Sequence, residues 1–513
     1  MNYFDISKFS DLEDPKERKL YRMLELLPAS LSFGILILLF AASKFFPVSV
    51  AIFIIIFDLY WFFRSFYFII FKINAYKRFK KSLNDDWTKK LNELKNYSIP
   101  VKNWKDIYQL IILPNYKEGE KVVEETLDSL KNCIYPKDKM IIVFACEERA
   151  GEERRVLAEK MQKKYEGQFL KFFTTFHPFG LPDEAIGKGS NNAWGLKEAK
   201  EKIIDKLNIP YEQIIVSNFD VDTKPYPQYF LCLTWNYLTA KKPLQATYQP
   251  IPVYNNNIWD APAFSRVISI SGTFWQLIQQ TKRSSLVSFS SHSIPFSTIL
   301  KVKYPNNLIP DDSRIFWKCV LYFNGNYRVI PLFYPVSMDA IQEKSYIKTA
   351  KAQYKQQQRW AWGCTDIPFL IFAFYKNKKI ALGKKLIFLW NLMEGHTSWA
   401  IASLIIFFFG WMPLLLGGEK FNSSVLAYNL PRIASNIMTI AMIGLVAAII
   451  VNFLLLPPRP KSKSRTKSII MVLQWLLLPI TFIFFSAFPA LDAQLRLFFG
   501  KYLEFWPTPK FRN

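Results

Sequence analysis

The feature that most constrains this chain is its apolar character at both ends, with a polar and mixed segment between residues 73 and 364. Two apolar stretches open the sequence, Leu24–Ser43 and Val48–Phe71, and each approaches the roughly 20 residues with which a helix crosses a bilayer. A basic flank, typical of the cytosolic side, follows at once and consists of Lys72, Lys77, Arg78, Lys80 and Lys81. Residues 1–72 therefore predict an N-terminal segment with two transmembrane helices.

Apolar character returns in residues 365–513. The short, aromatic-rich stretch Asp366–Tyr375 predicts an interfacial helix. Three further spans are predicted at Thr397–Leu416, Ile433–Leu456 and Ile469–Leu491. The loop Pro457–Lys467 holds five basic residues and no acidic one, which places it in the cytosol. With five spans and a cytosolic N-terminus and centre, we expect the C-terminal tail on the opposite side of the membrane.

The net charge of +25, from 66 Lys and Arg against 41 Asp and Glu, is typical of proteins that bind nucleic acid, an anionic lipid surface or a polyphosphate substrate. The sequence contains no zinc finger, basic zipper or basic-aromatic nucleic-acid motif, so we expect a lipid bilayer and no nucleic acid as partner. The expected location is the plasma or inner membrane, with the polar domain in the cytosol. Reduced, buried cysteines agree with a cytosolic domain, and the five cysteines form no Cys-x-x-Cys pair.

Residues 73–364 alternate short β-rich runs with helical patterns, which indicates a βαβ sheet. The predicted strands are Ile107–Leu113, Met140–Ala145, Leu170–Phe176 and Gln213–Phe219. The predicted helices are Glu118–Lys131, Glu152–Lys164 and Asn191–Lys206.

Two motifs follow predicted strands directly. The first strand leads into Pro114–Glu118, at the sheet edge where open α/β proteins bind ligands, although an ordinary loop would look the same. The fourth strand leads into Asp220-Val221-Asp222. Two carboxylates one residue apart at a strand end can hold a hard divalent cation, which in turn binds a diphosphate, and a plain Asp-rich turn is the alternative.

Two further motifs lie toward the C-terminal end of the polar segment. Asp311 and Asp312 precede a helix-like run, so they could cap that helix or supply a general base for transfer to a hydroxyl. Gln356, Arg359 and Trp360 share one helical face, where Arg suits a phosphate and Trp offers a flat surface for a sugar ring. An interfacial helix with an aromatic belt is the alternative for this face.

In this order the four sites resemble the processive-type membrane members of glycosyltransferase family 2, such as cellulose, chitin and hyaluronan synthases. The resemblance covers about residues 107–365 and the flanking apolar helices. The family's Pro-x-Tyr/Asn-x-Glu opening, Asp-x-Asp, acidic base pair and Gln-x-x-Arg-Trp match Pro114–Glu118, Asp220–Asp222, Asp311–Asp312 and Gln356–Trp360. The resemblance implies a GT-A (Rossmann-like) catalytic domain inserted between transmembrane helices.

The resemblance also implies the chemistry and the role of each residue. It implies inverting transfer of a sugar from a nucleotide-sugar, often UDP-linked, to a saccharide or lipid-linked acceptor, with Mg²⁺ or Mn²⁺ as cofactor. Asp222 and Asp220 would hold the metal, and Asp312, supported by Asp311, would be the base. Donor contacts would come from Pro114, Tyr116, Glu118, Glu147, Lys188, Asp220 and Arg359, and acceptor contacts from Gln356, Trp360 and His292.

The sequence departs from the family's pattern after the second strand, where the residue that reads uracil is usually Asp. Here the candidate is Glu147. Lys188 lies in Gly187-Lys188-Gly189-Ser190-Asn191-Asn192, which looks like the family's donor loop, although Ser190 could instead cap a helix. His292 could contact an acceptor or diphosphate, or have a structural role. Polymerisation, a single transfer to a lipid carrier, and an inactive membrane scaffold or transport subunit remain open at this point.

Overall fold

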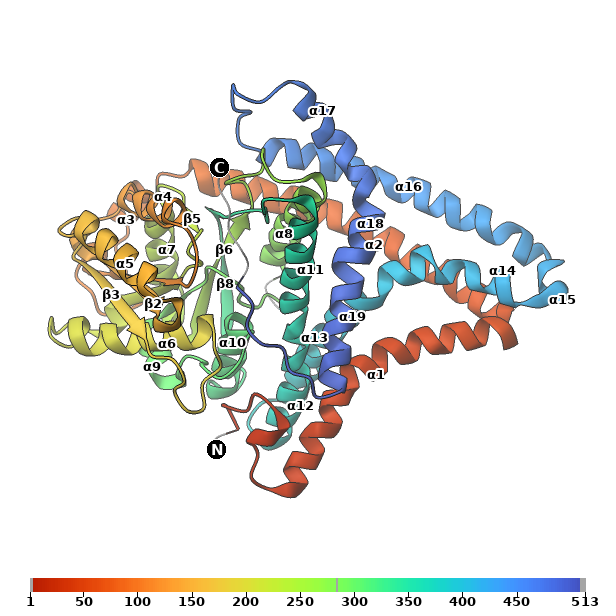
Figure 1. The fold of residues 1–513 in the computed structure, drawn as a ribbon, viewed down its shortest axis with the longest axis horizontal. Helices are drawn as coiled ribbons and strands as arrows, with labels where there is room; N and C mark the ends of the chain where they lie inside the picture. The colour runs from red at the N-terminus through yellow and green to blue at the C-terminus, as the bar shows by residue number, and fades with distance from the viewer. Residues whose placement is uncertain (1–2, 283–284, 508–513) are drawn as a thin grey trace.

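The computed structural model describes residues 3–282 and 285–507 and joins an α/β domain to long apolar helices (Figure 1). The domain contains an eight-stranded sheet in the order β3-β2-β1-β4-β7-β6-β8-β5. Its strands are β1 (Tyr108–Asn115), β2 (Met140–Glu147), β3 (Lys171–His177), β4 (Ile214–Asn218), β5 (Lys224–Pro225), β6 (Ala246–Val253), β7 (Ser293–Pro295) and β8 (Arg328–Ser337).

The first half of the sheet is parallel, with β1 between β2 and β4 and β3 beyond β2. Along β1, Ile111 and Leu113 belong to one apolar cluster while Leu110 and Ile112 belong to the other, because successive strand residues face opposite sides. Helices α4 (Glu120–Lys131) and α5 (Glu152–Tyr165) pack in the first cluster and α6 (Lys188–Ala199) in the second. The four predicted strands agree with the observed ones to within two residues at each end.

The second half of the sheet is mixed, and the sequence patterns did not predict it. β7 pairs antiparallel with both β4 and β6, β6 pairs parallel with β8, and β5 pairs antiparallel with β8. The helices of this half are α7 (Tyr229–Thr239), α8 (Ala263–Thr281), α9 (Phe296–Val302) and α10 (Asp311–Tyr322). The predicted fold class is confirmed, since a GT-A-like sheet of mixed direction lies between long apolar helices in the chain.

Two helices connect the sheet to the second apolar region, α11 (Tyr346–Ala361) and α12 (Asp366–Lys376). In α12, Phe369, Leu370 and Ala373 have no exposed surface and belong to the same cluster as the sheet. The interfacial helix predicted at Asp366–Tyr375 is therefore wrong, because its apolar side chains are buried in the domain and against α1.

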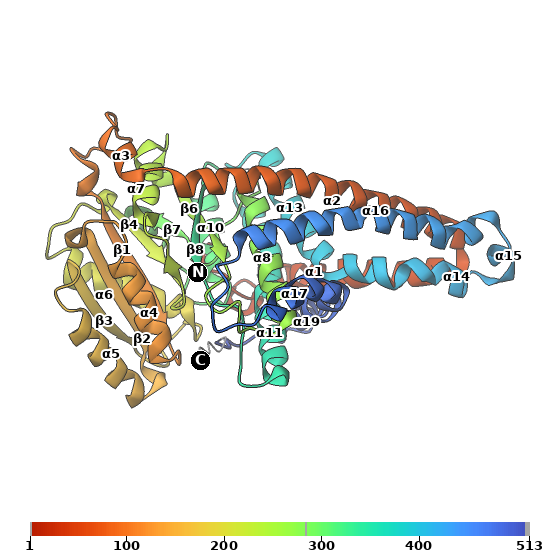
Figure 2. The same ribbon diagram turned by 90° about the horizontal axis from the view of Figure 1, so that it is seen from above.

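Four helical segments extend together away from the domain toward a tip at α15 (Gly418–Asn422) (Figures 1 and 2). They are α1 (Pro15–Phe45), α2 (Pro47–Asn84), α13 (Leu382–Phe407) continued by α14 (Met412–Leu416), and α16 (Val425–Leu455). Many of their apolar side chains are exposed, for example Ile37, Leu38 and Phe63, as lipid contact requires. A short α3 (Trp87–Asn92) links α2 to the domain.

Among residues 3–282 and 285–507, four helices are long and apolar enough to cross a membrane, or up to five if the bent α13–α14 pair is one span. One of the four is the continuous run Thr466–Phe498, which comprises α17 (Thr466–Leu473), α18 (Leu478–Phe482) and α19 (Phe488–Phe498). This run passes the same length and hydropathy criteria as the others, but it crosses the domain ends of the other four segments instead of running beside them (Figures 1 and 2).

The segment after α19 returns to the α/β domain. The ring of Phe505 lies so close to Gly187 that a Cβ added there would be 2.6 Å away, and Lys355 lies over the ring of Trp506. The tail up to residue 507 therefore lies against the α/β domain, whereas the sequence predicts the tail on the opposite side of the membrane from that domain. The predicted span Ile469–Leu491 falls within the apolar helical run Thr466–Phe498.

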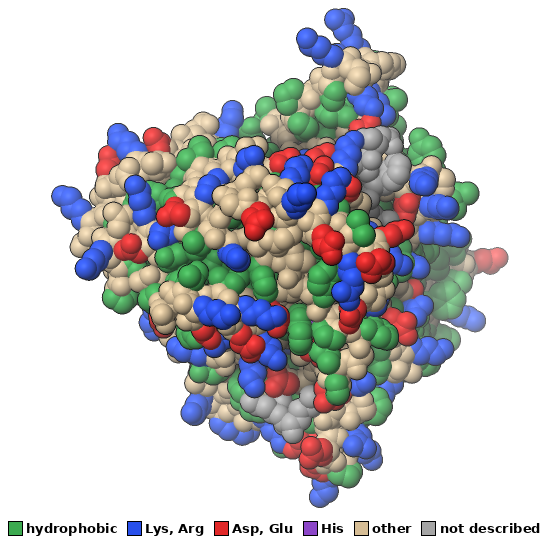
Figure 3. Space-filling view, turned by 60° about the vertical axis from the view of Figure 1, so that its left-hand side comes forward, with side chains coloured by type: hydrophobic (Ala, Val, Ile, Leu, Met, Phe, Trp, Pro, Cys, Tyr) green, Lys and Arg blue, Asp and Glu red, His purple; other side chains and the backbone are tan. Residues whose placement is uncertain are grey.

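The face of the α/β domain that Figure 3 presents carries Lys and Arg side chains interspersed with Asp and Glu. All five cysteines are buried and carry free thiols, as the sequence predicts. The N-terminal segment is fixed to the same domain, because Lys318 donates to Asp5 at 2.8 Å and Arg314 donates to the carbonyl of Ile6 at 2.7 Å.

Candidate active site

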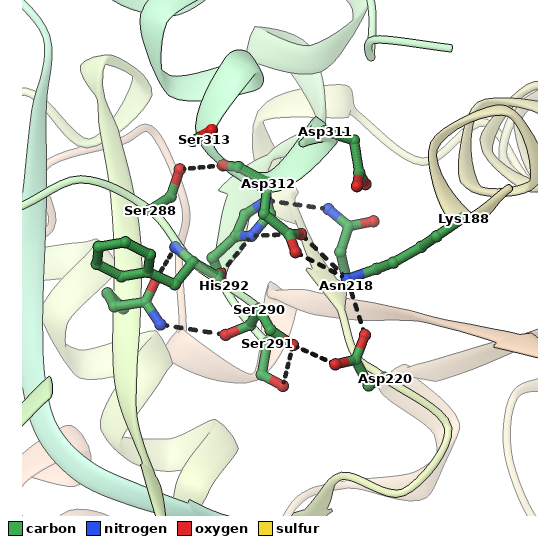
Figure 4. A network of polar contacts seen from close by, with 12 residues as sticks. Lys188, Asn218, Asp220, Ser288, Ser290, Ser291, His292, Asp311, Asp312 and Ser313 are labelled. Carbon is green, nitrogen blue, oxygen red and sulfur yellow. Dashed lines mark hydrogen bonds and ion pairs between the residues drawn. The ribbon is translucent and has the colours of Figure 1, made fainter. Parts of the chain in front are cut away.

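Three charged residues that are far apart in the chain meet where strands β1 and β4 end (Figure 4). Asp220 follows β4, Lys188 is the first residue of α6, and Asp312 is the second residue of α10. The Lys188 Nζ atom lies 2.9 Å from Asp220 Oδ1 and 3.1 Å from each carboxylate oxygen of Asp312. The fold therefore brings together two of the predicted acidic motifs and the predicted donor loop.

Lys188 is a buried cation between two partly exposed carboxylates. Burial by itself lowers the pKa of Lys188, but Asp220 and Asp312 outweigh it and raise that pKa above its usual value. Gly187 occupies the N-cap position of α6, so the alternative in which Ser190 caps the helix is wrong. A Cβ at Gly189 would lie 2.8 Å from the carbonyl oxygen of Pro305, so this position requires glycine to bring α6 close to α10.

The two adjacent carboxylates at the start of α10 have different environments. Asp312 faces Lys188 and keeps 23% of its side chain exposed, whereas Asp311 is buried and accepts a hydrogen bond from the Tyr304 hydroxyl at 2.8 Å. Burial, and next the charge of Asp312, raise the pKa of Asp311 to about 7. Neither carboxylate caps the helix, because Pro310 occupies the N-cap position.

Asp222, two residues after Asp220, is fully buried. Its Oδ2 atom accepts a hydrogen bond of 2.9 Å from the backbone N–H of Asp339, which follows β8. The Asn256 amide donates to the Asp222 carbonyl at 3.0 Å and to Asp339 Oδ1 at 2.8 Å. Within the described ranges 3–282 and 285–507, no three His, Cys, Asp or Glu side chains form a group that could hold a metal ion by themselves.

The loop before β7 contacts both acidic motifs. Ser290 donates to Asp220 Oδ2 at 2.6 Å, and Ser288 donates to the backbone carbonyl of Asp312 at 2.6 Å. His292 lies beneath Asp312, with Nδ1 3.5 Å from Asp312 Oδ1 (Figure 4). Because His292 has no exposed surface, the predicted direct contact between His292 and an acceptor does not fit this structure.

The turn after β1 is organised by Glu118. Its Oε2 atom accepts hydrogen bonds from the backbone N–H of Tyr116 at 2.8 Å and from the Asn115 amide at 3.1 Å. Arg149 lies 4.0 Å from the centre of the Tyr116 ring. Pro114 is half-buried and is the next-to-last residue of β1. The motif therefore places Tyr116 just past the end of the strand, where Glu118 accepts a hydrogen bond from its backbone N–H.

A pocket opens at the carboxyl ends of β2 and β3. Glu147, Arg149, His177, Glu184 and Gly187 are among its lining residues. Arg149 pairs with Glu147 at 2.5 Å, and His177 pairs with Glu184 at 2.8 Å. Glu147 thus faces a polar pocket that adjoins the loop carrying Lys188.

The predicted face of α11 lies beside the C-terminal tail. The Arg359 guanidinium is 5.5 Å from the Phe505 ring, which also contacts Gly187. Trp360 is 37% exposed, and its ring lies 6.3 Å from that of Tyr254. Gln356 is buried, and its side-chain oxygen accepts a hydrogen bond from Gln353 at 3.3 Å.

Sequence reasoning missed several residues that shape the site. Asp339, Asn256 and Ser290 each contact an acidic motif, and Tyr254 is close enough to Asp220, Asp222 and Arg359 for their charges to act on its hydroxyl. Of the residues in the loop before β7, the sequence pointed only to His292.

No protein-family model and no curated protein matches this sequence. Among solved structures, a mannosyltransferase from Pyrobaculum calidifontis in complex with GDP-Man and Mn²⁺ is similar at 14% identity, with a TM-score of 0.45, 88% of this chain covered and 100% of that chain. Residues 1–349 of S. aureus TarS in complex with UDP-GlcNAc align at 12% identity and a TM-score of 0.35, covering 77% of this chain and 93% of that chain. At these identities the similarity identifies no family.

Proposed function

We propose that this protein is an inverting, metal-dependent glycosyltransferase that moves a sugar from a nucleotide-sugar donor to a hydroxyl acceptor at the face of a membrane. The observation that carries the proposal is the meeting of Asp220, Lys188 and Asp312 at one edge of the sheet. In open α/β sheets, ligands bind outside the carboxyl ends of the strands. A cation and two carboxylates there supply groups for holding a diphosphate and for accepting a proton.

Asp312 is the proposed general base, because part of its carboxylate is exposed while that of Asp311 is buried. The acceptor oxygen forms a bond to the anomeric carbon while the bond from that carbon to the diphosphate oxygen breaks. The hydroxyl proton passes to Asp312, and the nucleoside diphosphate leaves with the electron pair. A single displacement inverts the anomeric centre and needs no covalent nucleophile.

Asp220 and Asp222 are the proposed ligands for Mg²⁺ or Mn²⁺. Carboxylate oxygens suit these hard ions, and Mg²⁺ commonly takes one or two protein carboxylates and fills its remaining positions with substrate phosphates and water. Two carboxylates therefore fit such an ion without a third acidic or His side chain. When bound, the ion neutralises the charge that develops on the leaving diphosphate.

The remaining predicted residues surround this centre. Two residues at the carboxyl ends of β1 and β2 are proposed to contact the nucleoside. They are Tyr116, in the turn between Pro114 and Glu118, and Glu147, which lines the pocket described above. Arg359, beside the Lys188 loop, is proposed to contact the diphosphate. Trp360 and the buried Gln356 on the same helix are proposed for the acceptor side, where the exposed indole can stack on a sugar ring.

The proposal is tested by incubating the purified full-length protein with a panel of UDP-, GDP- and other nucleotide-sugars, with and without Mg²⁺ or Mn²⁺. We expect one sugar class to support release of the nucleoside diphosphate, and release to require the metal. Analysis of product length and of lipid linkage then separates polymerisation from a single transfer. If no nucleotide-sugar is bound or turned over under any metal condition, the proposal is wrong.

The membrane arrangement is also proposed. The loop from Pro457 to Lys467 lies beside the domain, where Lys463 pairs with Asp260 and Trp259 donates to the carbonyl of Pro457 at 3.3 Å. We propose four spans, with the N-terminus, the α/β domain, this loop and the tail in the cytosol and α15 outside. In this arrangement Thr466–Phe498 lies along the inner membrane surface, with exposed apolar side chains such as Leu476 facing lipid.

Cysteine labelling in intact cells tests this arrangement, because all five native cysteines are buried. A cysteine at Ser423, next to α15, should react with an impermeant reagent. Cysteines at Lys463 and Phe505 should react only after permeabilisation. Labelling of Phe505→Cys from outside would restore the five-span arrangement.

A further inference from the structure

A buried histidine lies directly behind the acidic centre and has no place in the proposed reaction. His292 precedes β7 and has no exposed surface. Its backbone is fixed because its carbonyl accepts a hydrogen bond of 3.0 Å from the backbone N–H of Asn218 at the end of β4. Its ring nitrogens lie near three groups: the Phe289 carbonyl, the Asn218 amide and the Asp312 carboxylate.

The partners of the ring define its tautomer. Nδ1 lies 2.9 Å from the Phe289 carbonyl oxygen, which can only accept, so Nδ1 carries a proton. Nε2 lies 3.5 Å from the Asn218 amide nitrogen, a donor, so Nε2 presents its lone pair. Burial is the first cause that lowers the pKa of His292, which favours this neutral ring.

The same Nδ1–H group is close to the proposed base. Nδ1 is 3.5 Å from Asp312 Oδ1, while Lys188 lies 3.1 Å from both oxygens of that carboxylate. The carboxylate thus lies between a buried cation and a buried N–H dipole whose direction the Phe289 carbonyl fixes. Ser288, four residues before His292, donates to the backbone carbonyl of Asp312 and holds the start of α10 to the same loop.

We propose that His292 is a positioning residue for Asp312, which limits the rotamers of the base through the contact between its Nδ1 edge and the Asp312 carboxylate. This inference rests on the proposed function, because it requires Asp312 to accept the acceptor's proton. A base must be within hydrogen-bond reach of that proton, and a misplacement of about 1 Å costs about 100-fold in rate. His292 prevents rotation of Asp312 without touching donor or acceptor.

The alternative is that His292 only fills space in the core. The two roles are separated by substitutions that place a side-chain amide at different points. In His292→Asn the amide lies near the position of Nδ1, where it can still donate toward Phe289 and Asp312. In His292→Gln it lies near Nε2 instead, and His292→Leu fills the space with no donor. Ser285→Ala is the control in the same loop, because the Ser285 hydroxyl donates to the Lys282 carbonyl at 3.4 Å and to no other group among the described residues.

The experiment measures kcat, the dissociation constant of the donor and the thermal midpoint for the full-length variants. We expect His292→Asn to keep kcat within several-fold of the wild type. His292→Gln and His292→Leu should lose about 10- to 100-fold in kcat with unchanged donor affinity. A His292→Leu protein with wild-type kcat would overturn the inference, as would equal losses in His292→Asn and His292→Gln, since packing alone then explains the residue.

A second readout does not depend on turnover. Experimental structures of the wild type and of His292→Gln should differ in the Asp312 side chain, which is expected to leave Lys188 only in the variant. An Asp312 side chain in the same rotamer in both proteins would overturn the inference even if the enzyme proves active. Failure of the wild type to bind or use any nucleotide-sugar would instead overturn the proposed function.

Discussion

The two acidic motifs, Asp220 with Asp222 and Asp311 with Asp312, lie on different elements, but each pairs a partly exposed carboxylate with a buried one. In each pair one carboxylate is partly exposed and faces Lys188, namely Asp220 and Asp312. The other carboxylate is buried and held by the protein, Asp222 by the backbone N–H of Asp339 and Asp311 by the Tyr304 hydroxyl. Sequence proximity therefore does not give two carboxylates the same environment.

The local backbone geometry explains why one carboxylate of each motif is partly exposed and the other is buried. Asp311 and Asp312 are consecutive in the first turn of α10, so their side chains point about 100° apart around the helix axis. Asp220 and Asp222 lie between β4 and β5, and because β5 pairs with β8, Asp222 reaches the backbone N–H of Asp339 just past β8. In each motif one carboxylate thus contacts Lys188, and the other accepts a hydrogen bond from a neighbouring part of the domain.

The largest loss of transfer rate is expected from substitution of Asp312. Asp312→Asn removes the proposed base, and such a loss typically costs ~100–10,000-fold in rate. Donor affinity should stay nearly unchanged, because the proposed metal ligands are elsewhere. Transfer rate and donor affinity measured side by side check this, with Ser285→Ala as the control. An active Asp312→Asn enzyme would leave the mechanism without a base.

The next effect is expected at Asp222. Asp222→Asn removes a carboxylate that is proposed to hold the metal, which supplies several kcal/mol of charge stabilisation, so turnover should fall by about 100-fold or more. Unlike Asp312→Asn, this variant should also lose the part of nucleotide binding that depends on Mn²⁺. Titrations of nucleotide with and without Mn²⁺ measure that part. Wild-type affinity in both conditions would show that Asp222 is not a ligand.

Smaller effects, on stability and donor affinity, are expected from substitution of Lys188, the cation that contacts both motifs. Lys188→Met leaves Asp220 and Asp312 without it, while Lys188→Arg keeps the charge. Because both carboxylates are partly exposed, the loss of stability in Lys188→Met should be about 1 kcal/mol. Thermal unfolding checks this value, and donor affinity should fall in Lys188→Met more than in Lys188→Arg. Equal behaviour of the two variants would argue against a charge-based role.

The smallest effect on catalysis is expected at Asp311, where pH dependence of stability is the sensitive measurement. The pKa of Asp311 is raised to about 7, so the folded protein retains a proton that the unfolded chain releases above about pH 4. The free energy of unfolding should therefore decrease as pH rises from about 4 to 7. Asp311→Asn should lose this component and remain active, as measured by thermal unfolding between pH 5 and pH 8. An unchanged pH dependence would contradict the assigned proton.

The sequence predicted the parts of this protein that repeat a local pattern. The buried strands β1 to β4 are nearly continuous apolar runs, and the helices between them show regular spacing of apolar residues, so both were found to within a few residues. The family resemblance also predicted one shared site for Asp220, Lys188 and Asp312, and the three side chains are in contact in the fold. By contrast, β7 has only three residues and β8 carries two prolines, so neither gave a usable pattern.

Tertiary structure decided four features that have no local signal. It decided that Thr466–Phe498 runs across the other apolar helices, because hydropathy measures how apolar a helix is but not which neighbours cover it. It decided that the tail returns to Gly187 and that the loop before β7 contacts both acidic motifs. It also decided which carboxylate of each motif faces Lys188. These contacts join residues far apart in the chain, whereas sequence patterns report only on near neighbours along one strand or helix.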